Sequence, residues 1–126
     1  MKLFLAAAFT ERARMRAIRD KVLRPLGVEV TSRWIDLIDV DDTSPSRLVA
    51  SGTDNLYDIR RADTFVLFTT PASTAGGAHL ETGYAWLLGI PILVVGPPVN
   101  LYHHHPRIHA VLPSLGELCR WLRERT

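Results

Sequence analysis

The feature that most constrains the fold is a pair of short apolar runs separated by a helical segment. Residues 64–70 read TFVLFTT and residues 90–95 read IPILVV, and neither run alternates between polar and apolar side chains. Strands of this kind are buried on both faces, which is typical of parallel sheets covered by helices. The intervening residues 78–88 have the length expected of a covering helix, ended by Gly89. The sequence therefore predicts an α/β fold.

The same alternation of strand and helix extends over the whole chain. We expect strands at 2–9, 28–35, 64–70, 90–95 and 108–112, and helices at 11–26, 46–62, 78–88 and 114–125. Strands joined by helices form right-handed βαβ units. We therefore predict a flavodoxin-like three-layer sandwich, an α/β fold with a parallel sheet of about five strands in the order 2-1-3-4-5. A length of 126 residues fits a single domain, 1–126.

Composition excludes several classes of protein. A net charge of +2 is too small to indicate binding to polymeric nucleic acid. The apolar runs are too short to cross a bilayer, and the opening MKLFLAAAF is interpreted as a strand rather than a signal peptide, so we expect no membrane association. The single cysteine, Cys119, rules out an internal disulfide framework and favours a cytoplasmic location.

Glu81 is the most prominent candidate for a functional carboxylate. It follows the pair Gly76-Gly77, which is expected to open a helix directly after the buried strand at 64–70, and we place it in the first helical turn. Chemistry in open parallel sheets is found at the carboxyl ends of strands. A carboxylate in a first turn also compensates the helix dipole, so an ordinary structural glutamate is the alternative interpretation.

Other candidate residues are expected at the same edge of the sheet. Three of these candidates come at the end of the first expected strand: Phe9, Thr10 and Arg12. One comes at the end of the second strand, Trp34, and three lie on the helix before the third strand: Asp54, Asn55 and Asp58. Asp54 and Asp58 are four residues apart and share a helix face. A pair of carboxylates at one pocket is the arrangement used by enzymes that cleave glycosidic bonds. Arg12 either binds an anionic ligand or belongs to a solvated helix face.

The sequence does not predict a cofactor or a metal site. It contains neither a dinucleotide-binding GxGxxG nor a Walker-type phosphate loop, and no GxSxG nucleophile elbow. His103, His104 and His105 are consecutive, a spacing at which side chains rarely point at one metal ion. A histidine of this loop in contact with a ligand is the more plausible role.

Several of these segments together resemble the nucleoside 2-deoxyribosyltransferase family, including its 2′-deoxynucleoside 5′-monophosphate N-glycosidase relatives. The matching segments, which extend to about Pro98, are Phe9-Thr10-Glu11-Arg12, Ala62-Asp63 before an apolar strand, the motif Glu81-x-Gly83-Tyr84-Ala85, and Gly89-Ile90-Pro91-Ile92. The resemblance implies a flavodoxin-like fold, a homodimer or larger homo-oligomer, and a nucleoside or nucleotide substrate. It implies that Glu81 attacks C1′ of 2-deoxyribose and forms a covalent intermediate, with Tyr84 in the substrate pocket.

One position departs from the family pattern. The family takes its general acid from an aspartate eight residues before the aspartate of Ala62-Asp63, and here that position is Asn55. Either Asp54 or Asp58 replaces it, or the acid is absent and the activity is altered. The alternatives are therefore a transferase or hydrolase acting on the N-glycosidic bond and a non-catalytic nucleotide-binding module. Arg12 and the Gly76-Gly77 turn are the two candidate positions for a 5′-phosphate.

Overall fold

The computed structural model describes residues 1–37, 44–70 and 76–125, and within these ranges five strands form one parallel sheet. The strands are β1 (Lys2–Ala6), β2 (Glu29–Val30), β3 (Thr64–Phe68), β4 (Ile92–Val95) and β5 (Ile108–Leu112). Their order is β2-β1-β3-β4-β5, and each neighbouring pair is parallel. The predicted α/β class, the flavodoxin-like layering and the strand order are confirmed.

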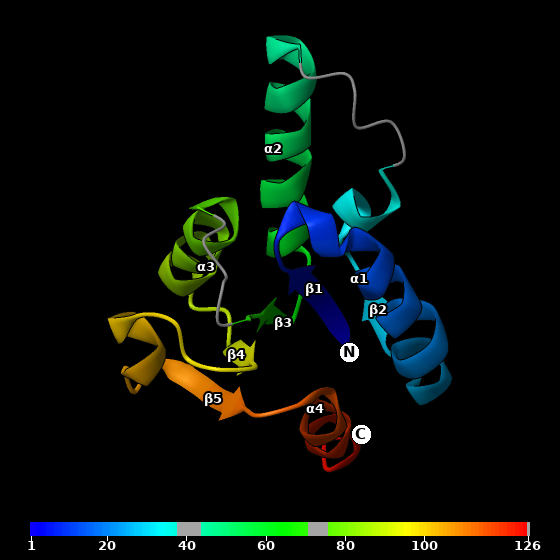
Figure 1. Ribbon diagram of the computed structural model, residues 1–126, viewed down its shortest axis with the longest axis vertical. Helices are drawn as coiled ribbons and strands as arrows, with labels where there is room; N and C mark the ends of the chain where they lie inside the picture. Colours follow the sequence, from blue (N-terminus) through cyan, green and yellow to red (C-terminus); the bar gives the residue numbers. More distant parts are fainter. Residues whose placement is uncertain (38–43, 71–75, 126) are drawn as a thin grey trace.

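Helices cover both faces of this sheet. Helices α1 (Arg12–Ile18) and α4 (Leu115–Arg123) lie on one face, and α2 (Pro45–Arg60) and α3 (Gly76–Leu88) lie on the other (Figure 1). The core lies between these layers, where Phe4 of β1 stacks on Phe65 of β3 with ring centroids 5.5 Å apart. Cys119 of α4 is buried and free. Among the described residues, no helix is long and apolar enough to cross a membrane.

The second strand is much shorter than the predicted range 28–35. It covers only Glu29–Val30 and is followed by the 3₁₀ turn η4 (Arg33–Asp36). Two side chains replace the missing ladder bonds to Leu5 of β1. Ser32 Oγ accepts the Leu5 N–H at 2.6 Å, and the Trp34 indole N–H donates to the Leu5 carbonyl at 2.8 Å. The strand stops because these side chains satisfy the backbone of its neighbour.

The first helix is also shorter than the predicted range 11–26, because the α-helix ends at Ile18. A π-helical turn, η2 (Arg19–Leu23), and a 3₁₀ turn, η3 (Arg24–Leu26), complete the segment. Pro25 lies in η3, lacks a backbone N–H and cannot continue an α-helical ladder. Gly27 then ends the segment in the left-handed region, at φ 75°. Upstream, the predicted strand 2–9 ends at Ala6 and Phe9–Glu11 form the 3₁₀ turn η1.

The strand ends at the candidate edge are packed closely. Gly96 follows β4 with φ 118°, and a Cβ at this position would lie 2.5 Å from the carbonyl oxygen of Thr69. The Thr69 hydroxyl donates to the Pro97 carbonyl at 2.6 Å. Only a glycine fits this approach, which ties the end of β3 to the turn that leaves β4. The connection from β4 to β5 carries the 3₁₀ turn η5 (Leu101–His104).

Candidate functional site

Glu81 lies on α3, which follows the carboxyl end of β3 and packs against β3, β1 and β4. The helix begins at Gly76, so Glu81 is in its second turn and not in the first turn expected from sequence. The helix dipole acts mainly within the first turn and gives this carboxylate little support. Residues 71–75, which separate β3 from α3 in the sequence, lie outside the described residues, as do residues 38–43.

Burial determines the ionisation of Glu81. The side chain is largely removed from water, and this desolvation raises the pKa of Glu81 from 4.5 to about 7. Burial, which penalises the charged form, is the main cause of this rise. A carboxyl group that titrates near neutrality is typical of functional sites.

Asn55 is the polar partner that the structure gives to Glu81. It lies on α2, which packs against α3, and it is partly buried. Its side-chain amide hydrogen-bonds the Glu81 carboxylate and opposes the rise in the pKa of that group. The position at which the family resemblance implies an acid therefore contacts the predicted nucleophile, through a side chain that cannot titrate.

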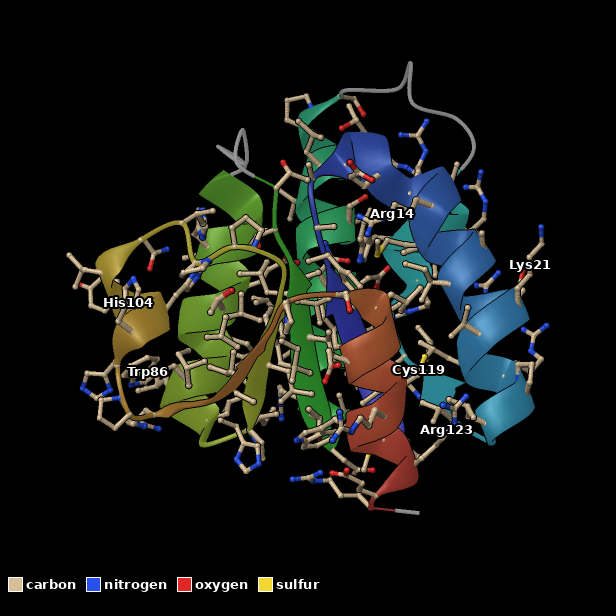
Figure 2. All side chains as sticks on the ribbon, turned by 60° about the horizontal axis from the view of Figure 1, so that its bottom comes forward. Arg14, Lys21, Trp86, His104, Cys119 and Arg123 are labelled. Atoms are coloured by element: carbon tan, nitrogen blue, oxygen red, sulfur yellow. The ribbon has the colours of Figure 1, made fainter. Side chains whose placement is uncertain are left out.

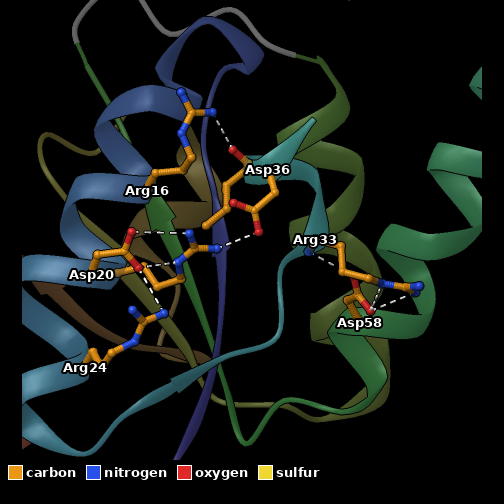
Figure 3. A network of polar contacts seen from close by, with 8 residues as sticks. Arg16, Asp20, Arg24, Arg33, Asp36 and Asp58 are labelled. Atoms are coloured by element: carbon orange, nitrogen blue, oxygen red, sulfur yellow. Dashed lines mark hydrogen bonds and ion pairs between the residues drawn. The ribbon is translucent and has the colours of Figure 1, made fainter. Parts of the chain in front are cut away.

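The predicted general acids, Asp54 and Asp58, both form ion pairs with Arg33. Figure 3 shows the pair of Arg33 with Asp58. Asp58 is fully buried and accepts hydrogen bonds from the Arg33 backbone N–H at 3.1 Å and from its Nε at 3.0 Å. Arg61 adds a second cation, 3.6 Å from the same carboxylate. Asp54 is half exposed and lies 3.4 Å from an Arg33 Nη. Both predicted general acids are therefore held in ion pairs with Arg33.

The sequence pattern offered no indication of the role of Arg33. It follows the second strand and its partner Asp58 is 25 residues away in another element, so the ion pair depends on the tertiary fold. A neighbouring network on η4 connects Asp36 with Arg19 at 2.6 Å, and Arg19 also pairs with Asp20 (Figure 3). Both networks fix η4, one against α2 and the other against the helical segment that follows β1.

The structure brings together three of the predicted substrate-binding residues at the end of β1. The rings of Phe9 and Trp34 lie 6.3 Å apart, and the Arg12 guanidinium lies 4.4 Å from the centroid of the Phe9 ring. Arg12 also donates to the Phe9 carbonyl at 3.2 Å. Phe9 is half exposed, whereas Trp34 is buried and supports the cluster from below. Thr10 is exposed beside them.

The remaining predicted residues lie on α3. Gly76 and Gly77 are exposed at the beginning of the helix, and Tyr84 is partly buried against the core. These positions lie on the element that carries Glu81. Among the described residues, no hydrogen bond, ion pair or ring contact links them to the cluster of Phe9, Arg12 and Trp34.

A cavity of about 510 Å³ lies on a different side of α3, between this helix and η5. Its walls are mainly apolar, and its lining residues are His79, Thr82, Gly83, Trp86, Asn100, Tyr102, His103 and Ile108. Figure 2 shows Trp86 and His104 at this end of the molecule, away from Arg14 on α1 and Lys21 on η2. Glu81 is not among the lining residues, so the cavity lacks the carboxylate chemistry of the edge described above.

Of the residues that line this cavity, only Gly83 and His103 belong to segments that stand out in the sequence. Burial and the neighbouring histidines lower the pKa of His103, and its Nδ1 accepts the Val99 N–H at 3.0 Å. The Asn100 side chain caps η5, and His79 Nδ1 is buried without a hydrogen-bond partner. In the described part of the chain, no group of three or more histidine, cysteine or acidic side chains is arranged to hold a metal ion.

Comparisons with known proteins relate the chain to solved structures. No protein-family model matches the sequence, and no curated protein matches it in a sequence search. A 2-deoxyribosyltransferase from Bacillus psychrosaccharolyticus superposes with a TM-score of 0.76 at 24% identity, over 94% of this chain and 90% of that one. The CMP N-glycosidase of Clostridium botulinum gives a TM-score of 0.61 at 21% identity, over 98% and 99%.

A conserved protein from Enterococcus faecalis V583 gives a TM-score of 0.75 at 18% identity, over 100% of this chain and 99% of that one. Identities this low establish the fold, and the three structures match it over nearly the full length of both chains. The fold implied by the resemblance to deoxyribosyltransferases is thereby confirmed: this chain folds like a 2-deoxyribosyltransferase and like a CMP N-glycosidase.

Proposed function

We propose that the protein is an enzyme that cleaves or transfers the N-glycosidic bond of a 2′-deoxynucleoside or its 5′-monophosphate, with Glu81 as the nucleophile. The observation that carries this proposal is the partly buried Glu81 carboxylate on α3, the helix that follows the carboxyl end of β3, where desolvation raises the pKa of the group to about 7. The shared fold of a 2-deoxyribosyltransferase and a CMP N-glycosidase supports it.

The proposed reaction proceeds in two displacements. A Glu81 carboxylate oxygen attacks C1′, the C1′–N bond breaks, and its electron pair leaves with the base, which takes up a proton. The resulting deoxyribosyl ester on Glu81 is then attacked at C1′ by a second base or by water, which restores the carboxylate. Transfer and hydrolysis differ only in this second acceptor.

The cluster at the end of β1 supports a nucleotide substrate. The half-exposed Phe9 ring offers an apolar surface for a sugar or base, and Arg12 lies on that ring with guanidinium N–H groups beyond the one bound to the Phe9 carbonyl. A guanidinium can make two parallel hydrogen bonds to a phosphate. We therefore place a 5′-phosphate at Arg12, in preference to the Gly76-Gly77 turn.

The second candidate is a non-catalytic nucleotide-binding module of the same fold. The observation that favours it is the amide of Asn55 beside Glu81, together with the binding of Asp54 and Asp58 to Arg33. In this candidate the edge retains a nucleotide but lacks a group that protonates the departing base.

A base-release assay separates the two candidates. Deoxynucleosides and their 5′-monophosphates are incubated with the protein, with and without an acceptor base, and products are followed by chromatography. We expect release or exchange of base by the wild type and loss of at least about 10³-fold in Glu81→Gln, because the covalent route is removed. Arg12→Ala weakens only the reaction of monophosphates. Wild-type turnover by folded Glu81→Gln contradicts the nucleophile assignment.

The pH dependence gives a second test of the role of Glu81. A nucleophile must be ionised, and burial raises the pKa of Glu81 to about 7. We therefore expect kcat/KM to rise with pH up to about neutrality and then to level, since this parameter reports groups of the free enzyme. A value of kcat/KM that falls through the same range would make Glu81 a proton donor instead.

We further propose that the protein forms a homodimer or larger homo-oligomer through α2 and α3. Leu80 and Leu87, seven residues apart on one face of α3, are 74% and 82% exposed, and α2 exposes Val49 and Tyr57. Adjacent exposed apolar side chains on packed helices are typical of protein–protein interfaces.

A further inference from the structure

The cavity between α3 and η5 contains polar groups that its own walls leave without suitable partners. Its volume of about 510 Å³ lies within the usual range for small-molecule sites, and its walls are mainly apolar. Pockets of this kind hold the apolar body of a ligand and orient it with a few polar groups. The polar groups here belong to His79, Asn100 and His103, and their hydrogen bonds indicate which kind of ligand atom suits them.

The hydrogen bonds of η5 determine where His103 carries its proton. Its Nδ1 accepts the backbone N–H of Val99 at 3.0 Å, and an imidazole nitrogen that accepts a hydrogen bond carries no proton. Burial, and after it the nearby His79 and His104, lowers the pKa of this ring and favours its neutral form. A neutral His103 therefore carries its one ring proton on Nε2, and that nitrogen is a donor.

The side chain of Asn100 places a second donor beside the first. Its Oδ1 accepts the backbone N–H groups of Tyr102 at 2.9 Å and of His103 at 3.2 Å, which identifies the oxygen and turns the NH₂ group the other way. Asn100 Nδ2 lies 3.3 Å from His103 Nε2. Two donors cannot satisfy each other, and no described residue gives either nitrogen an acceptor.

A third unsatisfied nitrogen lies on the facing helix. His79 Nδ1 is buried without a hydrogen-bond partner in the described part of the chain. The rings of His79 and His103 lie 6.1 Å apart, measured between their centroids. Buried polar atoms are nearly always paired in folded proteins, so this atom marks a position suited to a ligand group. Nδ1 donates in one neutral tautomer and in the protonated ring.

A carboxylate suits these three nitrogens better than a single carbonyl oxygen does. A carbonyl oxygen has two lone pairs and leaves one of the three donors unmet, whereas the two oxygens of a carboxylate have about four acceptor positions. The rest of such a ligand meets an apolar wall. Trp86 and Tyr102 form it, with their rings edge to face and their centroids 6.3 Å apart.

The negative charge of a carboxylate has to be met by the histidines. No lysine or arginine is among the described residues that line the cavity. Titratable side chains lie near this site on two elements: His79 on α3, and Tyr102 and His104 on η5. The third element, β5, contributes the apolar Ile108. A carboxylate beside His79 and His103 favours their protonated forms, so its binding takes up a proton.

We propose that this cavity is a second ligand site, which binds a small apolar carboxylate, aromatic or branched aliphatic, through Asn100, His103 and His79. The site is separate from the edge that carries Glu81, because Glu81 is not among its lining residues. The inference goes beyond the proposed function and does not rest on it.

The hydrogen-bond pattern is tested first, on the protein without ligand. Histidine labelled with ¹⁵N gives a separate imidazole signal for each of the five histidines, and the two that matter are assigned with His79→Gln and His103→Gln. We expect His103 to be neutral at neutral pH, with its proton on Nε2. A proton on Nδ1 of His103 overturns the proposal, because the pair of donors then does not exist.

Ligand binding is then measured by calorimetry and by the same signals, with phenylacetate, 3-phenylpropionate and 4-methylpentanoate as probes. We expect saturable binding with a Kd of about 1 mM or tighter for at least one of them, and at least about tenfold weaker binding of its amide. The affinity rises as the pH is lowered from about 8 to about 6, since binding takes up a proton. Failure of all three carboxylates to bind, or equal affinity for acid and amide, overturns the proposal.

Asn100→Asp reverses one donor and keeps the cap of η5. Its carboxylate can still accept the backbone N–H groups, but it also gives His103 Nε2 an acceptor and repels a second carboxylate. We expect the affinity to fall at least about tenfold in Asn100→Asp and in His79→Leu. Thr82→Val is the matched control, because the Thr82 hydroxyl lies in the same wall but donates to the Ala78 carbonyl of its own helix at 2.8 Å.

We expect Thr82→Val to bind the carboxylate like the wild type. An equal loss in all three variants would mean that the shape of the cavity, and not its donors, holds the ligand, and would overturn the proposal. Glu81→Gln separates this site from the proposed reaction, since we expect it to lose base release and to keep carboxylate binding. Loss of carboxylate binding in Glu81→Gln places the ligand at the other edge and overturns the proposal. A wild type that binds carboxylates and releases no base leaves this site standing and refutes the proposed function.

Discussion

The burial of Glu81 lowers the free energy of unfolding at neutral and alkaline pH. Its pKa is 4.5 in an unfolded chain and about 7 in the folded protein, so the folded state binds a proton more tightly. Between these two values the folded state holds more protons than the unfolded state, and the free energy of unfolding therefore falls as pH rises. Below pH 4.5 both states are protonated and the penalty is absent, whereas above about pH 7 it is fully developed.

Replacing the charge should therefore stabilise the protein in a pH-dependent way. We expect Glu81→Gln to unfold at the same denaturant concentration as wild type at pH 4, and to be more stable at pH 8 by at most about 3 kcal/mol. Denaturant unfolding at the two pH values measures this difference. A gain of the same size at both pH values would mean that the amide improves packing and that the charge of Glu81 carries no penalty.

At the scale of elements, Arg33 is the connection between η4 and α2. Its backbone N–H and its guanidinium both reach the buried Asp58, and the same guanidinium reaches Asp54 on the surface. Removing one partner of a buried ion pair is costly because the remaining charge stays in the interior. Surface pairs contribute far less, because water and salt screen them.

These two environments predict unequal effects of substitution. We expect Arg33→Ala to lower the free energy of unfolding more than Asp54→Asn does, because it leaves the buried Asp58 with Arg61 as its remaining cation. Asp54→Asn should cost less than about 1 kcal/mol. Urea unfolding with a common m-value compares the two variants. Equally small losses of stability in both variants would show that Asp58 finds a replacement partner. A large loss in Asp54→Asn would show that the ion pair of Arg33 with Asp54 is the more important of the two.

Replacing glycine with alanine should have opposite effects on stability at Gly96 and at Gly52. At Gly96 the left-handed φ and the 2.5 Å approach to Thr69 leave no room for a methyl group, whereas Gly52 inside α2 faces open space. We expect Gly52→Ala to stabilise by about 0.5–1 kcal/mol through helix propensity. Gly96→Ala should destabilise by at least about 1 kcal/mol, from backbone strain and displacement of Thr69. Thermal unfolding distinguishes the signs, and a stabilising Gly96→Ala would contradict the described turn.

At the scale of the whole molecule, the exposed leucines of α3 bear on assembly. If α2 and α3 form the interface, an aspartate in place of both Leu80 and Leu87 should convert the oligomer to a monomer, because buried carboxylates at an interface lack partners. Leu101 on η5 is equally exposed, at 73%, and Leu101→Asp is the matched control. Light scattering coupled to size exclusion measures the mass. A wild-type monomer, or dissociation caused only by Leu101→Asp, would refute this interface.

The sequence predicts the features that repeat locally and misses those that depend on distant partners. The apolar runs at 64–70 and 90–95 were sufficient to predict a parallel sheet, because burial on both faces leaves a pattern in the strand itself, whereas the strand order followed from assuming a flavodoxin-like arrangement. The end of β2 was missed because it depends on Ser32 and Trp34 binding Leu5 across the sheet.

The same distinction holds at the candidate site. Glu81 stands out from its motif, but the direction of its pKa shift depends on its burial in the folded protein, which its own segment does not encode. Likewise Asp54 and Asp58 are visible as a pair on one helix face, while their partner Arg33 follows the second strand and comes near only after folding.

The shortness of β2 also bears on solubility. An edge strand offers its unpaired backbone groups to any foreign strand, and long flat edges invite stacking into aggregates. Here that edge of the sheet presents only Glu29–Val30 before η4 turns away, and Glu29 is exposed there. The two side chains that end the ladder at Leu5 therefore also leave the sheet with too little free edge on this side to template another chain.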